Sequence, residues 1–333
     1  MQVGFFFWPF APALVERMAE AAERGGWDMV GVADTPGNAM DPWVAATMLA
    51  LRTRRPRLAL CVTNLASRHP AVSAAAIASL DLLAPGRTVL GLGLGHSGTS
   101  NLGITRSTPA ELAEGTQYIR ALLSGAAARW QKGGEARLTW ANGAPPIFLA
   151  ASGPKALAAA GRAADGVFVN YGIDGEALSH SERAIREAAV AAGRDAAGIE
   201  IWQVAALDCS EDEAAARRRI GAILAFMAAG YILGSGDLAA RGVPRELHGP
   251  MQELRRRYST RPGAADAALV DELGLFDYLS RRFAVWGTPQ ACRARLEEAQ
   301  RAGLRRVMFT VSLAADPAAT VTLFGERVLP ALR

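Results

Sequence analysis

The sequence predicts an α/β protein, specifically a (β/α)8 TIM barrel with an insertion before the last strand. Short apolar segments rich in β-branched and aromatic residues alternate with alanine-rich helical segments along the 333 residues. Eight such units average about 42 residues each, which is typical of this barrel. Residues 58–62 (LALCV) are continuously apolar, as expected for a strand that is covered on both faces.

Each predicted strand is a short apolar segment, and each is followed by a helical pattern. The first helix shows the period clearly, because Leu14, Met18 and Ala21 fall on one face. In chain order the predicted strands are residues 3–8, 28–33, 57–63, 88–94, 147–151, 166–170, 199–207 and 306–312. The predicted helices are residues 13–24, 42–52, 70–83, 109–123, 154–164, 175–192, 211–229 and 318–329.

The spacing breaks once, between the seventh and eighth units. About 75 residues separate the helix that ends near residue 229 from the last strand, and they are rich in glycine and proline. We interpret residues 231–282 as an insertion of loops and short helices over the C-terminal mouth of the barrel. Long insertions there commonly act as lids or substrate walls, but a peripheral or interface element explains this one equally well. We expect residues 1–333 to form one domain.

Composition and charge exclude several classes of protein. Half of the residues are hydrophobic and 20% are charged, which is the balance of a globular protein with a large core. The net charge is +4 (36 basic against 32 acidic residues), and no nucleic-acid-binding motif accompanies it. The apolar N-terminus lacks the basic segment of a signal peptide, and no apolar run is long enough to span a membrane.

The three cysteines, Cys61, Cys209 and Cys292, are too few and too scattered for a disulfide framework or a zinc site. We expect reduced thiols in a cytoplasmic protein. The four histidines show no metal-ligand spacing either, so no metal site is predicted.

A glycine-rich stretch follows the fourth predicted strand. Gly93, Gly95 and Gly98 match G-x-G-x-x-G, but a dinucleotide fold needs this motif after its first strand and inside the start of a helix. Three strands precede it here, and residues 99–108 are not expected to be helical. His96 and Ser97 leave a hydrolase triad open as an alternative. The remaining interpretation is that the glycines let a flat ligand approach the backbone closely.

A second candidate site lies at Ser152, Gly153, Pro154 and Lys155. A strand ends here and proline begins a helix at its first position. Free backbone N–H groups, the helix dipole and the lysine would converge on one point, which suits a phosphate. An ordinary capped helix start is the alternative.

Polar residues also end the second and third predicted strands. Asp34 follows the second strand, while Thr63 and Asn64 end the third. Because active sites of (β/α)8 barrels lie at the C-terminal ends of the strands, these side chains are candidates for the site. Turn formation and strand-end capping are the alternatives. The aromatic residues 5–8 and Trp43 would either wall a pocket or pack in the core.

These pieces, taken in order, resemble the bacterial luciferase-like superfamily of flavin-dependent oxidoreductases. That superfamily includes FMN-dependent monooxygenases and reductases that use the deazaflavin coenzyme F420. The resemblance is strongest to its methylenetetrahydromethanopterin reductase-like branch, and it spans nearly the whole chain. The matching segments are residues 19–28 with 32–34, 61–64 with 68–72, 83–87 with 91–95, 152–155 with 164–166, and 287–289 with 302–303.

The resemblance implies a flavin ring at the barrel mouth, against a bulge with a non-proline cis peptide that maps to Cys61–Val62. It also implies which residues bind the cofactor. Asp34, Thr63, Asn64 and Gly95 would line the ring; Ser152, Gly153, Pro154 and Lys155 would hold the tail phosphate; and Asn170 would end the sixth strand at the same mouth.

One departure from the family pattern concerns the residue after Gly95. Relatives often carry aspartate where this chain has His96, which replaces a carboxylate by an imidazole that titrates near neutral pH. We therefore expect His96 to be a catalytic residue that gives or takes a proton.

The implied activity is oxidation or reduction of a small organic substrate. We favour a monooxygenase that uses reduced FMN and oxygen, with a partner flavin reductase that supplies the reduced cofactor. The alternative is an F420-dependent reductase that transfers a hydride. Arg245 and residues 255–257 would offer it a basic track, although a solvated helix face explains these arginines equally well. A non-catalytic flavin-binding homologue and a serine hydrolase are more remote alternatives. The resemblance also implies a homodimer that pairs through helices beside the second and third strands, where residues 71–78 are small.

Overall fold

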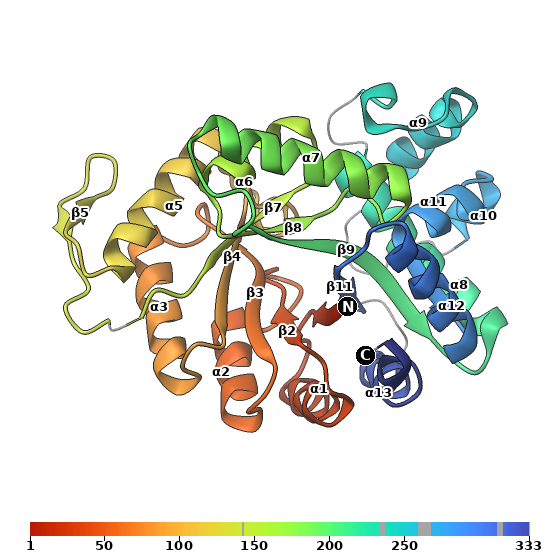
Figure 1. The fold of residues 1–333 in the computed structure, drawn as a ribbon, viewed down its shortest axis with the longest axis horizontal. Coiled ribbons are helices and arrows are strands. Elements are labelled where there is room, and N and C mark those ends of the chain that lie inside the picture. The colour runs from red at the N-terminus through yellow and green to blue at the C-terminus, as the bar shows by residue number, and fades with distance from the viewer. Residues whose placement is uncertain (142, 233–236, 259–267, 312–315, 333) are drawn as a thin grey trace.

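Eight parallel strands close into a barrel in the computed structural model, which describes residues 1–141, 143–232, 237–258, 268–311 and 316–332 (Figure 1). The sheet closes because β9 pairs with β8 on one side and with β11 on the other. The predicted (β/α)8 fold is therefore confirmed, although residue 312 of the last predicted strand lies outside the described residues. The barrel strands are β1 (Gln2–Phe7), β2 (Met29–Val32), β3 (Arg57–Asn64), β4 (Thr88–Gly93), β7 (Ile147–Ala151), β8 (Gly166–Val169), β9 (Glu200–Cys209) and β11 (Arg306–Thr310).

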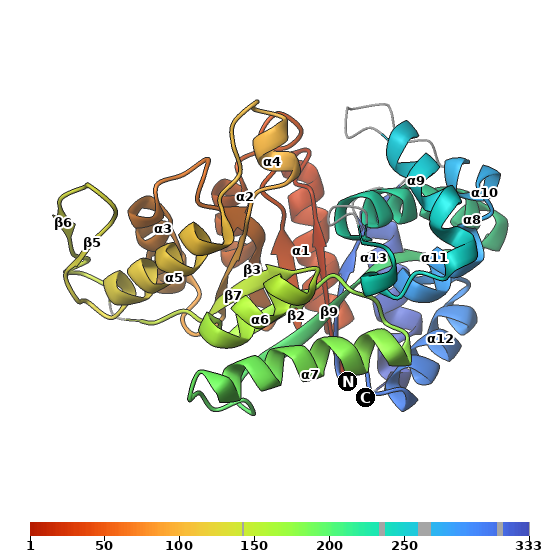
Figure 2. The same ribbon diagram turned by 90° about the horizontal axis from the view of Figure 1, so that it is seen from above.

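Helices surround the strands, and local start signals fix where several of them begin. The Asp41 carboxylate accepts hydrogen bonds from the first turn of α2, and Thr108 with Glu111 forms a capping box at α5. Figure 2 shows both chain termini on the side of the barrel opposite α4 and α9. The helices that follow the barrel strands are α1 (Pro12–Gly25), α2 (Pro42–Arg52), α3 (Pro70–Leu83), α5 (Pro109–Leu123), α6 (Pro154–Ala163), α7 (Gly175–Ala191), α8 (Glu213–Met227) and α13 (Pro317–Arg327).

Alternation along the strands divides the core into two parts. Phe5 and Phe7 of β1 pack in the outer cluster between sheet and helices, where Phe5 meets Trp27 at a ring-centroid distance of 4.8 Å. Phe6 points the other way, into the barrel, and belongs to the inner cluster with Met29 and Phe148. Successive strand residues face opposite sides of a sheet, so one aromatic run serves both layers.

An additional strand and helix precede the last barrel strand, and the sequence analysis did not predict them. Strand β10 (Ala284–Gly287) pairs in parallel with the C-terminal part of β9, and α12 (Pro289–Arg301) follows it. Four residues are too short to show a strand period, so only the pairing with β9 identifies the strand. The structure also adds a short hairpin, β5 (Ala128–Arg129) with β6 (Glu135–Ala136), which projects beside α5 (Figure 1).

The described part of the predicted insertion consists of short helices and loops, as expected. Residues 233–236 and 259–267 of the predicted range lie outside the described residues. Helix α9 buries Met251 and Leu254 in the inner core cluster. The elements are η1 (Ala228–Ile232), η3 (Ala239–Arg241), η4 (Arg245–Leu247), α9 (His248–Arg257), α10 (Leu269–Glu272) and α11 (Phe276–Phe283).

Two further findings complete the fold. A four-residue helix, α4 (Ser97–Ser100), directly follows the glycine-rich stretch, so the expectation that residues 99–108 are not helical is wrong for its first two residues. Across the described residues, no helix combines the length and the apolar composition that crossing a bilayer requires.

Candidate active site

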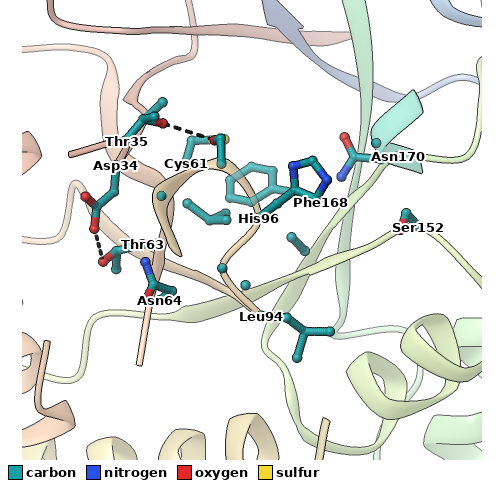
Figure 3. Close-up of a pocket in the computed structure, with 18 of the residues that line it drawn as sticks. Asp34, Thr35, Cys61, Thr63, Asn64, Leu94, His96, Ser152, Phe168 and Asn170 are labelled. Carbon is teal, nitrogen blue, oxygen red and sulfur yellow. Dashed lines mark hydrogen bonds between the residues drawn. The ribbon is translucent and has the colours of Figure 1, made fainter. Parts of the chain in front are cut away.

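A pocket opens at the C-terminal ends of the barrel strands (Figure 3). Asp34 and Thr63 lie on one side of it, and Ser152 and Asn170 lie on the opposite side. Nine of the twelve predicted site residues line this pocket: Asp34, Cys61, Val62, Thr63, Asn64, Gly95, His96, Ser152 and Asn170. Gly153, Pro154 and Lys155 are not among the lining residues.

The floor of the pocket is the bulged end of β3. The Cys61–Val62 peptide bond is cis, and the register with β4 shifts between Leu60 and Thr63. This confirms the bulge and the cis bond that the resemblance implied. Glycine in β4 makes the bulge sterically feasible, because a Cβ atom on Gly91 would lie 2.1 Å from the Leu60 carbonyl oxygen.

The polar edge of the pocket is built by the ends of β2 and β3. The Thr63 hydroxyl donates a 2.6 Å hydrogen bond to Asp34 Oδ2, and burial raises the pKa of the Asp34 carboxyl. Asn64 Oδ1 accepts bonds from the Ala66 and Ser67 backbone N–H groups at 3.0 and 2.9 Å. Asn64 thus combines the predicted capping role with a place in the pocket wall.

His96 lies between β4 and α4, and its ring makes no hydrogen bond to any described residue. Gly230 of η1 approaches it closely, because a Cβ atom there would lie 3.8 Å from the imidazole. Although the His96 residue is exposed at the pocket, partial desolvation by the surrounding protein lowers the pKa of its imidazole, and the positive charge of Arg106 acts in the same direction. We therefore expect a neutral imidazole at pH 7.

The hydrolase alternative finds no support in this geometry. The Ser97 hydroxyl lies 3.4 Å from the Thr35 hydroxyl, which accepts a 3.1 Å bond from Trp8 Nε1. In the described part of the chain no hydrogen bond joins Ser97 to His96, whereas a nucleophile and its base need one.

Of the four residues predicted to bind a phosphate, only one lines the pocket. Ser152 lines the pocket, while Pro154 and Lys155 are exposed and Gly153 is buried. Helix α6 begins at Pro154 without a side-chain cap. Against Gly153 lies the guanidinium of Arg241, a residue of the insertion, and a Cβ atom on the glycine would come within 2.4 Å of it.

Several lining residues were missed because their place depends on tertiary contacts. Arg106 comes from the loop after α4, and Phe226 and Gly230 come from the end of α8 and from η1. Their local sequence carries no signal of a site. Of the aromatic residues expected either to wall a pocket or to pack in the core, Phe6 and Trp8 line the pocket. Phe5, Phe7 and Trp43 are core residues.

A pocket of this kind at the mouth of a parallel barrel defines a (β/α)8 enzyme whose site is formed by strand ends and an insertion. Comparison with known proteins makes the assignment more specific. The family described as luciferase-like monooxygenase matches residues 8–306. The chain belongs to this family of oxidoreductases.

One relative matches along nearly its whole length. The 5,10-methylenetetrahydromethanopterin reductase of Methanolobus tindarius is 28% identical over 336 residues, which cover 99% of this chain and 100% of that protein. The family resemblance that the sequence analysis stated is therefore confirmed, including its reductase-like branch.

Three solved structures share the fold over all of this chain. The coenzyme F420-dependent tetrahydromethanopterin reductase of Methanopyrus kandleri has a TM-score of 0.79 at 23% identity, with 100% of that chain covered. An F420-dependent secondary alcohol dehydrogenase bound to an F420–acetone adduct has 0.75 at 19%, with 99% covered. A monooxygenase from Streptomyces bottropensis has 0.69 at 22%, with 100% covered.

Proposed function

We propose that this oxidoreductase uses coenzyme F420 and transfers a hydride to or from a small organic substrate. The observation that carries the proposal is the end-to-end similarity to a methylenetetrahydromethanopterin reductase. The two F420-dependent structures also have higher TM-scores than the monooxygenase. These comparisons support an F420-dependent reductase, the alternative prediction from the sequence, better than the FMN monooxygenase that was favoured there.

The shape and chemistry of the pocket fit a flat, polar-edged ring. Its floor is the apolar bulge at Cys61–Val62, and Gly93 packs directly against this bulge, since a Cβ atom there would lie 2.8 Å from the Val62 side chain. Hydrogen-bonding groups gather at one edge, where Asp34 and Asn64 lie. Flat cofactors bind in mostly apolar pockets with a few polar groups that fix their orientation.

When bound, the reduced deazaflavin supplies a hydride from a ring carbon. The residues of this chain orient the ring and handle the proton. We expect the Asn64 side-chain N–H groups to donate to the polar edge of the ring, because Oδ1 of this residue is already occupied. The neutral His96 imidazole is the group that would exchange a proton with the substrate. Phe226 and Trp8, whose rings meet at 5.8 Å, would keep water from the substrate side.

Binding of F420 and FMN, each oxidised and reduced, to the purified protein tests the proposal. We expect selective binding of F420, measured by fluorescence quenching or calorimetry, and F420-dependent turnover without oxygen consumption. Selective binding of reduced FMN would contradict it and would favour oxygenation with a flavin reductase as partner. Binding without any turnover would favour a non-catalytic homologue.

A further inference from the structure

A second cavity lies behind the wall of the active-site pocket, and it is rich in arginine. It has a volume of about 590 Å³ and lies between the start of α7, the η3 segment and α11. We call it the arginine cavity. Its charged lining residues are Arg183, Arg241, Arg281 and Arg282, against Asp174 and Glu176, so four positive charges minus two negative ones leave an excess of two.

The arginine at the centre of this lining is Arg282, which is only 6% exposed. Its Nε atom donates to the Tyr171 carbonyl at 3.0 Å, and Nη1 donates to the Tyr278 hydroxyl at 2.5 Å. Its Nη2 atom makes no hydrogen bond to any described residue, and no described carboxylate lies within ion-pair distance of the guanidinium. A buried positive charge without a counterion is unfavourable, so an anion bound in the cavity would stabilise the Arg282 guanidinium.

Other residues strengthen the positive field. Arg183 is exposed at the cavity rim and pairs with no described residue. Arg241 is close enough to Arg282 to feel its positive charge, which adds to burial in lowering the pKa of Arg241. On the acidic side, the Asp174 carboxylate already accepts the Ala177 backbone N–H as the N-cap of α7. That bond fixes the orientation of the carboxylate and leaves its charge in place. Arg281 lies 4.0 Å from Glu298, so the positive charge of the cavity rests mainly on Arg183, Arg241 and Arg282.

Neighbouring residues of the chain face the active-site pocket and the arginine cavity at two places. Ser152 lines the pocket, while its neighbour Gly153 packs under Arg241 of the cavity. In the same way, Asn170 lines the pocket and Tyr171 lines the cavity. A ligand group that leaves the pocket at Ser152 would therefore meet the arginines next.

We propose that the arginine cavity is a second anion-binding site, which takes a phosphate or carboxylate group beside the active-site pocket. Such a group has two sources, the acidic tail of the cofactor or a separate anionic molecule such as the substrate. The first source rests on the proposed function, whereas the site itself does not. The basic track predicted at residues 255–257 is a less suitable site for such an anion, because Arg256 and Arg257 already pair with Glu253 and Glu272.

Calorimetric titration of the full-length protein with inorganic phosphate tests the site. We expect saturable binding that Arg183→Gln weakens about fivefold to tenfold, since one charge-assisted contact is lost. Arg282→Met should weaken it more than tenfold. Arg218→Gln on α8 is the matched control, because Arg218 is also exposed and pairs with no described residue. Arg282 also bonds to Tyr171 and Tyr278, so the melting temperature of Arg282→Met is measured in parallel. If Arg282→Met unfolds, Arg183→Gln still decides the test.

Equal phosphate affinity in Arg183→Gln and Arg218→Gln, or no saturable binding in the wild type, would overturn the proposal. Repeating the titration with saturating F420 separates the two sources. Loss of phosphate binding would identify the cofactor tail as the occupant, and simultaneous binding would identify a separate anionic molecule. If F420 does not bind at all, the proposed function fails, while the phosphate titration still reports on the site.

Discussion

His96 is the residue whose chemistry depends most on its surroundings. Partial desolvation and the charge of Arg106 both lower its pKa below the ordinary value of 6.5, so the neutral form dominates at pH 7. If catalysis needs the neutral imidazole, activity is present above this lowered pKa and is lost as the pH falls through it.

His96→Asn should therefore reduce the rate of the chemical step about 100-fold and remove the acidic limb from its pH profile. Arg106→Gln should keep the limb and move it to higher pH, because one cause of the lowered pKa is gone. Single-turnover rates measured between pH 5 and 8 report both effects. An unchanged rate in His96→Asn would exclude the residue from proton transfer.

Asp34 illustrates the opposite shift. Burial raises its pKa above the ordinary value of 3.8, although the Thr63 hydroxyl opposes the shift by bonding the carboxylate. A raised pKa in the folded state means that the ionised form destabilises the fold. The favourable contribution of the protonated carboxyl is complete below 3.8 and is lost as the pH rises through the folded-state pKa.

Asp34→Asn keeps the shape and a hydrogen-bond acceptor for Thr63 but cannot ionise. We expect its unfolding free energy to exceed that of the wild type at pH 8, with a difference that shrinks toward pH 4.5. Urea denaturation at a series of pH values measures this directly. A difference that does not change with pH would show that the Asp34 charge carries no such penalty.

At the scale of elements, β3 and β4 depend on each other at the bulge. The bulge brings the Leu60 carbonyl so close to Gly91 that a Cβ atom would lie 2.1 Å away, and backbone cannot move aside cheaply. Gly91→Ala should lower the unfolding free energy by about 2–3 kcal/mol.

Gly134→Ala, between β5 and β6, is the control for that substitution, because Gly134 is exposed and an added Cβ atom would meet nothing within 4 Å. We expect this variant to unfold at the wild-type urea concentration or slightly above it. Equal stability of the two variants would mean that β3 can relax away from Gly91.

For the whole molecule, the outer faces of α2 and α3 suggest a partner. Val44 and Leu83 are 54% and 45% exposed and line the same apolar groove, which also includes Ala76 and Leu80. Exposed apolar patches commonly mark interfaces. We propose that a second copy of the chain covers this face, as the family resemblance implied.

Val44→Glu combined with Leu83→Glu should convert a dimer into a monomer in sedimentation or light-scattering measurements. Val190→Glu is the control, because Val190 is 66% exposed on α7 and lies away from the groove. A wild-type protein that is monomeric at micromolar concentration would refute the dimer.

The sequence by itself determined the barrel and much of the site. Continuously apolar segments locate the strands in the sequence, and a parallel barrel places the C-terminal ends of all its strands at one mouth. Residues next to those ends, such as Asp34, Thr63 and Asn170, were therefore predictable. The four-residue strand β10 was not, because its strand character comes from pairing with β9.

Only the tertiary structure decided which of the two cavities each residue faces. Ser152 and Gly153 are neighbours in the chain, yet one lines the active-site pocket and the other packs under an arginine of the insertion. The arginine cavity likewise joins Arg183, Arg241 and Arg282 from three separate elements. Local sequence fixes strands and helices through short-range patterns, whereas contacts between distant segments depend on how these elements pack.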